Sequence, residues 1–135
     1  MQTEARNHLS KGLMNLIRKT PFYTSLILKH KIIESDKINA IMATNGVNLI
    51  FHPSVLDLKV REMTEILKHE AMHIANKHHI RMKILEKRYK TQIKENNIDF
   101  RMTFNIAADL AINSTIPEQE LPKELLLMKF GANLL

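Results

Sequence analysis

The stretch Lys68-His69-Glu70-Ala71-Met72-His73 decides how the rest of the chain is interpreted. It holds two histidines four residues apart, with a glutamate directly after the first. On a helix, residues i and i+4 lie one above the other on the same face. Both imidazoles can therefore reach one metal ion, while Glu70, roughly 100° further round, can reach a water bound to it. This H-E-x-x-H arrangement, with two ligands and a general base, is typical of zinc hydrolases.

The segment around this motif predicts a long amphipathic helix. From about Ser54 or Asp57 to Lys77, apolar residues recur at helical spacing. They are Val60, Met63, Ile66, Leu67, Ala71 and Ile74. Glu62 and Glu65 lie in its N-terminal half, where negative charge suits the helix dipole. A catalytic zinc helix must hold its ligands beside the core so that their geometry is fixed. The motif lies in the last two turns of such a helix.

The residues before this helix predict a first helix and a small β-hairpin. The spacing of apolar residues indicates a helix from about Thr3 to Lys19, which Thr20-Pro21 ends because the residue before proline avoids helical angles. Residues 22–28 are ambiguous between strand and helix. Alternating residues 38–42 and the run 47–51 flank Thr44-Asn45-Gly46, and Asn-Gly between two β-type runs is a strong hairpin signal.

The residues after the motif predict a basic arm and a third helix. Residues 78–97 are rich in lysine and arginine and either extend the helix or form an arm. From about Ile98 or Asp99 to Asn113 the chain is apolar nearly all round, which indicates a buried central helix. We expect one domain over residues 1–135, with a basic insertion at about 80–97 and a C-terminal tail at 114–135.

The composition limits the kind of metal site that the chain can build. It is ordinary for a globular protein, with 44% hydrophobic and 25% charged residues, but it contains no cysteine. This excludes disulfide bonds and thiolate ligands. A metal ion must therefore be held by histidine and carboxylate side chains.

Two kinds of residue are candidates for the third metal ligand. Asp109 is the acid inside the nearly apolar third helix, where an ionised carboxylate is costly unless it is paired or bound to a metal. Asn105 and Asn113 lie one turn to either side of it and complete a polar stripe. The alternatives are His78 and His79; His79 follows His73 at the spacing of the extended metzincin pattern, with Asn76 in place of its glycine. We favour Asp109 and keep both histidines as alternatives.

Two separated motifs give the chain a family resemblance. Residues 69–78 and Asn105–Asn113, preceded by Asn48-Leu49-Ile50-Phe51-His52-Pro53, resemble a metallopeptidase domain of bacteria and phages. In larger relatives that domain precedes a von Willebrand factor A-like domain. The resemblance covers roughly residues 10–117, although Phe104 stands where the family usually has tryptophan. The family's H-E-x-x-H-x4-H falls on His69, Glu70, His73 and His78, and its N-x-A-x-D-x-x-I-N falls on Asn105, Ala107, Asp109, Ile112 and Asn113.

These observations predict an α+β, zincin-like fold, mostly helical, with a small hairpin or sheet beside the active-site helix. The predicted function is that of a zinc-dependent metallopeptidase. His69, His73 and Asp109 are expected to bind Zn²⁺, and Glu70 to take a proton from a zinc-bound water that attacks a peptide carbonyl. Asn48 or Phe51 could align an extended substrate at a sheet edge. The alternative is a catalytically inactive, metal-binding relative that acts as a protein- or nucleic-acid-binding module.

The expected partner is a peptide or protein substrate. The net charge of +6 and the basic segment Arg81–Lys94 add nucleic acid as an alternative partner. No segment has the ~18 consecutive apolar residues of a membrane span. Met1-Gln2-Thr3-Glu4 has neither a basic start nor an apolar run after it, so we expect a cytoplasmic protein.

Overall fold

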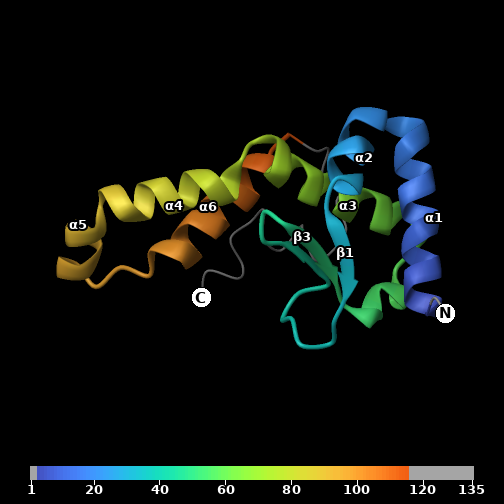
Figure 1. The fold of residues 1–135 in the computed structure, drawn as a ribbon, viewed down its shortest axis with the longest axis horizontal. Helices are drawn as coiled ribbons and strands as arrows, with labels where there is room; N and C mark the ends of the chain where they lie inside the picture. The colour runs from blue at the N-terminus through green and yellow to red at the C-terminus, as the bar shows by residue number, and fades with distance from the viewer. Residues whose placement is uncertain (1–2, 116–135) are drawn as a thin grey trace. The chain divides into compact units, whose positions relative to one another are not determined.

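The computed structural model describes residues 3–115, and the chain divides into two compact units, residues 1–76 and 77–135 (Figure 1). The N-terminal unit contains α1 (Glu4–Lys19), α2 (Pro21–Leu28), β1 (Lys31–Glu34), β2 (Met42–Thr44), β3 (Asn48–Phe51), the 3₁₀ helix η1 (Pro53–Asp57) and α3 (Val60–Ala75). The C-terminal unit contains α4 (His78–Arg88), α5 (Lys90–Glu95) and α6 (Phe100–Asn113). This mostly helical α+β content with a small sheet confirms the predicted fold class.

Helix α1 begins and ends where the sequence predicts. The Thr3 hydroxyl accepts a hydrogen bond from the backbone N–H of Arg6 at 3.1 Å and caps the helix. Pro21 starts α2 at the first helical position, where its missing N–H costs nothing. The ambiguous segment 22–28 is therefore a helix, with Thr24 and Ile27 turned into the core.

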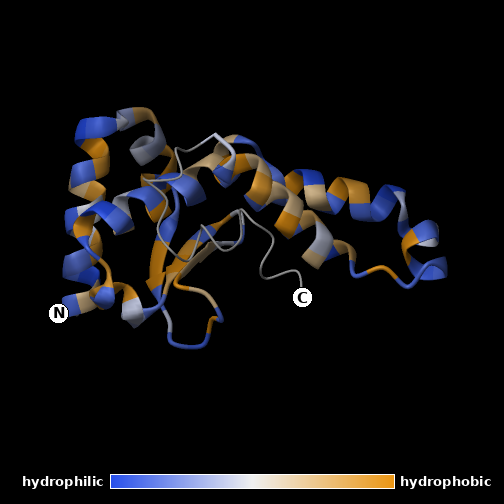
Figure 2. Cartoon of the chain, turned by 180° about the vertical axis from the view of Figure 1, so that it is seen from behind, coloured by the Kyte–Doolittle hydropathy of each residue, from blue (hydrophilic) through white to orange (hydrophobic). Residues whose placement is uncertain are grey.

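Helix α1 packs closely against α3. Its buried residues are Ala5, Leu9, Gly12 and Leu16, which form one stripe at helical spacing. The hydrophilic and apolar bands along α1 in Figure 2 reflect this one-sided burial. Asn15 donates a hydrogen bond to the hydroxyl of Thr64 on α3 at 2.9 Å, so the buried Thr64 hydroxyl is satisfied.

The sheet has the order β1-β3-β2, with β3 parallel to β1 and antiparallel to β2. The predicted hairpin is confirmed: the Asn45 side chain accepts from the N–H groups of Val47 and Asn48, and Gly46 has φ 89°. Its first strand is shorter than predicted, because residues 38–41 form bends before β2. Strand β1 was missed, since its pairing partner lies far along the chain and its four residues carry no alternation of their own.

The motif helix is shorter than predicted at both ends. Residues 53–57 form a separate 3₁₀ turn, in which His52 Nδ1 accepts from the N–H of Ser54 at 3.0 Å. Helix α3 then begins at Val60, and Glu62 accepts a hydrogen bond from the backbone N–H of Lys59 at 2.9 Å. It ends at Ala75, and Lys77 adopts a left-handed conformation with φ 54°. Asn76, which stands in place of the glycine of the extended metzincin pattern, has φ −85°.

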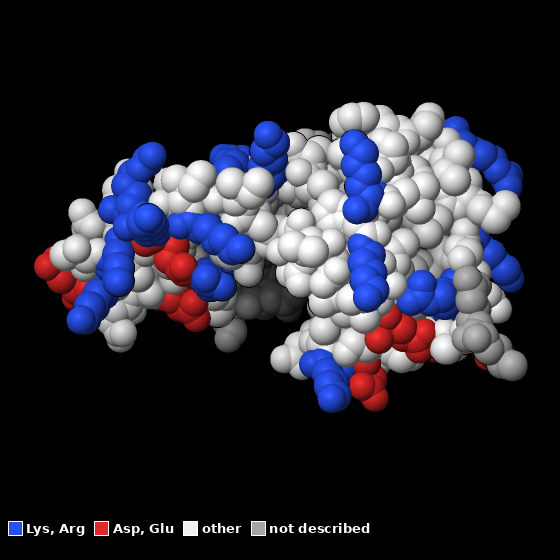
Figure 3. All heavy atoms as spheres, in the orientation of Figure 1, with Lys and Arg blue, Asp and Glu red and all other residues white. Residues whose placement is uncertain are grey.

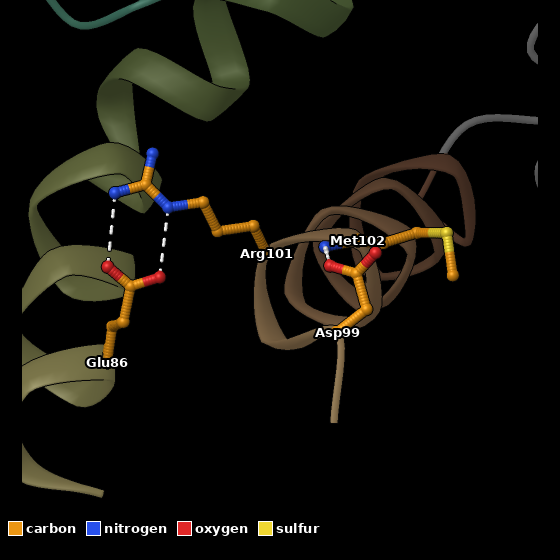
Figure 4. Close-up of polar contacts among 4 residues, drawn as sticks. All are labelled: Glu86, Asp99, Arg101 and Met102. Carbon is orange, nitrogen blue, oxygen red and sulfur yellow. Dashed lines mark hydrogen bonds and ion pairs between the residues drawn. The ribbon is translucent and has the colours of Figure 1, made fainter. Parts of the chain in front are cut away.

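Within the C-terminal unit, α4 and α6 pack against each other. The ring of His78 meets that of Phe104 edge-on, with 6.1 Å between centroids. Glu86 and Arg101 form a bidentate ion pair further along (Figure 4). The prediction that α6 is a buried central helix is wrong for its N-terminal half, because Met102, Asn105 and Ala107 are exposed. Its buried residues, Ala108, Asp109, Ile112 and Asn113, lie in its C-terminal half.

Two further expectations concern the C-terminal tail and membrane-spanning segments. Most of the predicted tail, residues 116–135, lies outside the described residues. Within residues 3–115, no helix combines the length and the apolar character that a membrane crossing requires.

Candidate metal centre

Helix α3 holds the two motif histidines with their rings facing each other. Nε2 of His73 lies 3.1 Å from Nε2 of His69, and the ring planes are nearly perpendicular at 79°. His69 is almost completely buried, with 2% of its surface exposed, while His73 is half-buried. This geometry follows from the helix alone, because residues four apart stack on one face.

The spacing of the two nitrogen atoms fits a shared metal ion. Zinc binds imidazole nitrogen at about 2.0–2.1 Å, and two ligands of a tetrahedral ion at that distance lie about 3.3 Å apart. The observed separation of 3.1 Å is close to this value. A neutral N–H of one ring donating to the other nitrogen explains the same distance without a metal. The pair is therefore already close to the arrangement that a zinc ion needs.

Two carboxylates are buried beside the histidine pair on the same helix. Glu70 follows His69 directly and is 8% exposed, and Glu65 lies one turn before His69 and is 5% exposed. A buried carboxylate is costly unless other groups compensate its charge. The sequence analysis identified Glu70, but for Glu65 it noted only a favourable position in the helix dipole and did not predict its burial. The signal was present, because Glu65, His69 and His73 recur every four residues and so share one face.

Asp109 completes a group that could hold a metal ion. His69, His73 and Asp109 are, among residues 3–115, the histidine and acidic residues grouped as possible ligands of one metal ion. Asp109 and Asn113 are both buried on α6, whereas Asn105 is exposed. Of the three residues in the predicted polar stripe, only Asp109 and Asn113 are therefore buried.

The alternative histidine ligands are not in this group. His78 is buried, with its ring against Phe104. His79, next to it on α4, is half-buried. Both follow Lys77, the residue at which the chain turns out of α3 and into α4.

Comparisons with known proteins show the family to which the chain belongs. The chain belongs to the family described as "Putative metallopeptidase domain", whose model matches residues 4–129. It is also 30% identical over 115 residues to an uncharacterized protein of Thermotoga maritima. The match covers 82% of this chain but only 26% of that protein, so the chain spans about a quarter of its relative. No solved structure matches the chain.

Proposed function

We propose that this chain is a zinc-dependent peptidase of the H-E-x-x-H type. The observation that carries the proposal is the pair of facing Nε2 atoms on α3, with the buried Glu70 directly after the first histidine. Both features lie within one helix of one unit. Membership of the metallopeptidase domain family and the His69–His73–Asp109 group support it.

In this proposal three side chains bind the metal. His69 and His73 contribute neutral Nε2 atoms, and Asp109 contributes a carboxylate oxygen. Nitrogen and oxygen ligands of this kind suit zinc and leave a position for substrate or water. The single negative charge of Asp109 leaves the centre with a net positive charge, which favours binding of a carbonyl oxygen.

Glu70 is the general base of the proposed reaction. When bound, zinc would act as a Lewis acid that polarises the scissile carbonyl and lowers the pKa of a coordinated water. Glu70 takes the proton of the attacking water and passes it to the leaving amine. Because Glu70 is buried, bulk water screens its carboxylate only weakly.

The sheet offers an edge that could align a peptide, although not at the residues first predicted. Asn48 and Phe51 lie on β3, the middle strand, whose hydrogen-bonding groups face β1 and β2. Strand β2 is an edge strand and contacts α3. Hydrogen bonds from Asn45 N–H to Asn48 O and from His52 N–H to Ile41 O show that the peptide groups of residues 41 and 45 face β3. By alternation, the peptide groups of Met42 and Thr44 face the open edge, where we propose that an extended substrate adds as a strand.

The test compares zinc content and peptide cleavage in the wild type and Glu70→Gln. The assay uses the zinc-loaded chain with casein and with a mixture of quenched fluorescent peptides. We expect cleavage by the wild type and a loss of about 100-fold or more in Glu70→Gln, with zinc retained. Glu95→Gln makes the same chemical change at an exposed position on α5 and should keep full activity.

The outcomes separate the enzyme from its alternative. If zinc binds at one ion per chain but neither protein cleaves any substrate, the chain is a metal-binding relative without this activity. If Glu70→Gln cleaves as fast as the wild type, Glu70 is not the base. If the wild type binds no zinc, the metal centre itself is wrong.

A further inference from the structure

The net charge of the chain is concentrated in one short segment of the C-terminal unit. Residues 81–94 carry six cationic side chains and one acidic side chain, Glu86, which leaves a net charge of +5. The whole chain carries +6, so the remaining residues together contribute only +1. Such an asymmetry is typical of proteins that bind a polyanion.

The structure places these cations on exposed surfaces of α4 and α5. The cationic residues of α4 are all exposed: Arg81, Lys83, Lys87 and Arg88. Lys90 and Lys94 are exposed one turn apart on α5. We call these six residues the basic arm. Figure 3 shows Lys and Arg atoms gathered over this part of the C-terminal unit, with acidic atoms among them.

The one acid within the segment is already neutralised. Both carboxylate oxygens of Glu86 accept hydrogen bonds from Arg101, at 2.9 and 3.1 Å (Figure 4). Glu86 points toward α6 through this pair, while Lys83 and Lys87 lie on the exposed arc of α4. Glu86 therefore offsets the charge of Arg101 rather than that of Lys83 and Lys87, whose exposed side chains direct their field to solvent.

We infer that the basic arm binds the phosphate backbone of nucleic acid. Successive cations at i and i+4 are about 6 Å apart along a helix, close to the spacing of phosphates along an extended single strand. Tyr89, between Arg88 and Lys90, is 46% exposed and offers an aromatic ring on which an unpaired base can stack. This combination favours a single-stranded nucleic acid.

Other polyanions fit the arm less well. An anionic membrane surface requires a wide apolar face beside the cations. Helix α4 exposes only Ile80 and Ile84 beside its cations, and the single isoleucine of α5, Ile93, is half-buried. An acidic protein surface offers no regular repeat of charge to match cations that continue over two helices.

The test measures binding of the full chain to a fluorescein-labelled 20-nucleotide single strand of mixed sequence. The arm variant is Lys83→Gln/Lys87→Gln/Arg88→Gln/Lys90→Gln. The control is Lys11→Gln/Arg18→Gln/Lys19→Gln/Lys29→Gln, which removes the same charge from exposed positions of the N-terminal unit. Circular dichroism verifies that both variants are folded. Binding is followed by fluorescence anisotropy from about 50 to 300 mM salt, where screening by salt changes the affinity most.

We expect the arm variant to bind about 100-fold more weakly near 0.1 M salt, and its salt slope to fall by about three, because each phosphate contact contributes about 0.7 to the slope for a single strand. The control should bind within a few fold of the wild type. Tyr89→Ala should weaken binding to the single strand more than to a duplex of the same sequence.

Three results would overturn the inference. The first is absence of binding by the wild type at about 50 mM salt, where phosphate contacts are strongest. The second is an equal loss of affinity in the arm variant and in the control, which would mean that binding depends on the net charge of the chain and not on the basic arm. The third is equal or tighter binding to poly-glutamate or to phosphatidylserine vesicles, which would make the partner an acidic chain or a membrane surface. His69→Ala should leave binding unchanged, so this result is independent of the metal centre.

Discussion

Gly12 on α1 lies so close to Met63 on α3 that a methyl group at Gly12 would come within 2.9 Å of the Met63 Cγ. The same methyl group would lie 3.2 Å from a methyl of Leu67. Met63 and Leu67 are both fully buried. The absence of a side chain at position 12 is therefore what allows the two helices to approach, and α3 carries the histidine pair.

Gly12→Ala tests this close approach. Alanine favours a helix interior by about 1 kcal/mol over glycine. Overpacking a full core costs about 1–3 kcal/mol. We expect a net loss of about 1 kcal/mol in the free energy of unfolding, measured by urea denaturation. Lys11→Ala, at an exposed position on the same helix, should change stability by a few tenths of a kcal/mol. A variant Gly12→Ala that is more stable than the wild type would show that α1 can move away.

The N-terminus of α6 depends on Asp99. Its Oδ1 accepts a hydrogen bond from the backbone N–H of Met102 at 3.3 Å (Figure 4). Asp99→Ala removes this cap and should destabilise the C-terminal unit by about 1 kcal/mol. Asp99→Asn keeps an acceptor oxygen and should lose much less. Amide hydrogen exchange of the first turn of α6 is the sensitive measurement, and equal exchange in both variants would contradict the capping role.

The local signals in the sequence predicted most of the N-terminal unit correctly. Thr20-Pro21 marked the end of α1, and Asn45-Gly46 marked the hairpin, because proline and glycine act on the backbone at their own positions. Strand β1 could not be predicted in the same way, since its hydrogen bonds go to β3, 17 residues later in the register of Lys31 and Asn48. The place of β3 in the middle of the sheet was not predicted for the same reason.

The candidate site was predictable where one helix determines it. The facing of His69 and His73 follows from their spacing, and Asp109 was singled out because it is the acid inside a nearly apolar helix. The burial of Glu65 was not anticipated, because a charged side chain is usually exposed. Its position on the same helix face as His69 and His73 was not taken into account. The exposure of Met102 and Ala107 on α6 was missed because an apolar sequence does not tell which neighbours are present to cover it.

The Glu86–Arg101 pair should contribute to stability in a pH-dependent way. Hydrogen bonds from Arg101 lower the pKa of the Glu86 carboxyl below its ordinary value of 4.5. A group whose pKa is lower in the folded state stabilises the fold above its unfolded pKa, and that contribution is lost as the pH falls through the folded value. The pair is exposed, so salt should weaken it.

Thermal unfolding of the wild type and Glu86→Gln between pH 3 and 7 measures this contribution. At low salt we expect the wild type to be slightly more stable at pH 7. The difference should shrink below about pH 4.5. Glu95→Gln, on exposed α5, serves as the control and should show a smaller change. A difference that persists at pH 3 would mean that packing of the Glu86 side chain, rather than its charge, is responsible.

The third metal ligand can be decided by zinc binding in matched variants. In the proposed centre, zinc binds only the folded chain, so it should raise the midpoint of thermal unfolding. At 100 times the dissociation constant this stabilisation amounts to about 2.7 kcal/mol. His69→Ala, His73→Ala and Asp109→Ala should each lose both the bound zinc, measured by mass spectrometry of metal content, and the thermal shift.

The matched substitution at the alternative position is His78→Phe, which removes the imidazole but keeps an aromatic ring against Phe104. It should retain zinc and the full thermal shift, and so should His79→Ala. Asp109→Asn keeps the size of the side chain but removes its charge. It should bind zinc more weakly than the wild type, because a neutral amide oxygen is a poorer ligand than a carboxylate. If Asp109→Ala keeps its zinc while His78→Phe loses it, the third ligand is His78, and the buried Asp109 serves another purpose.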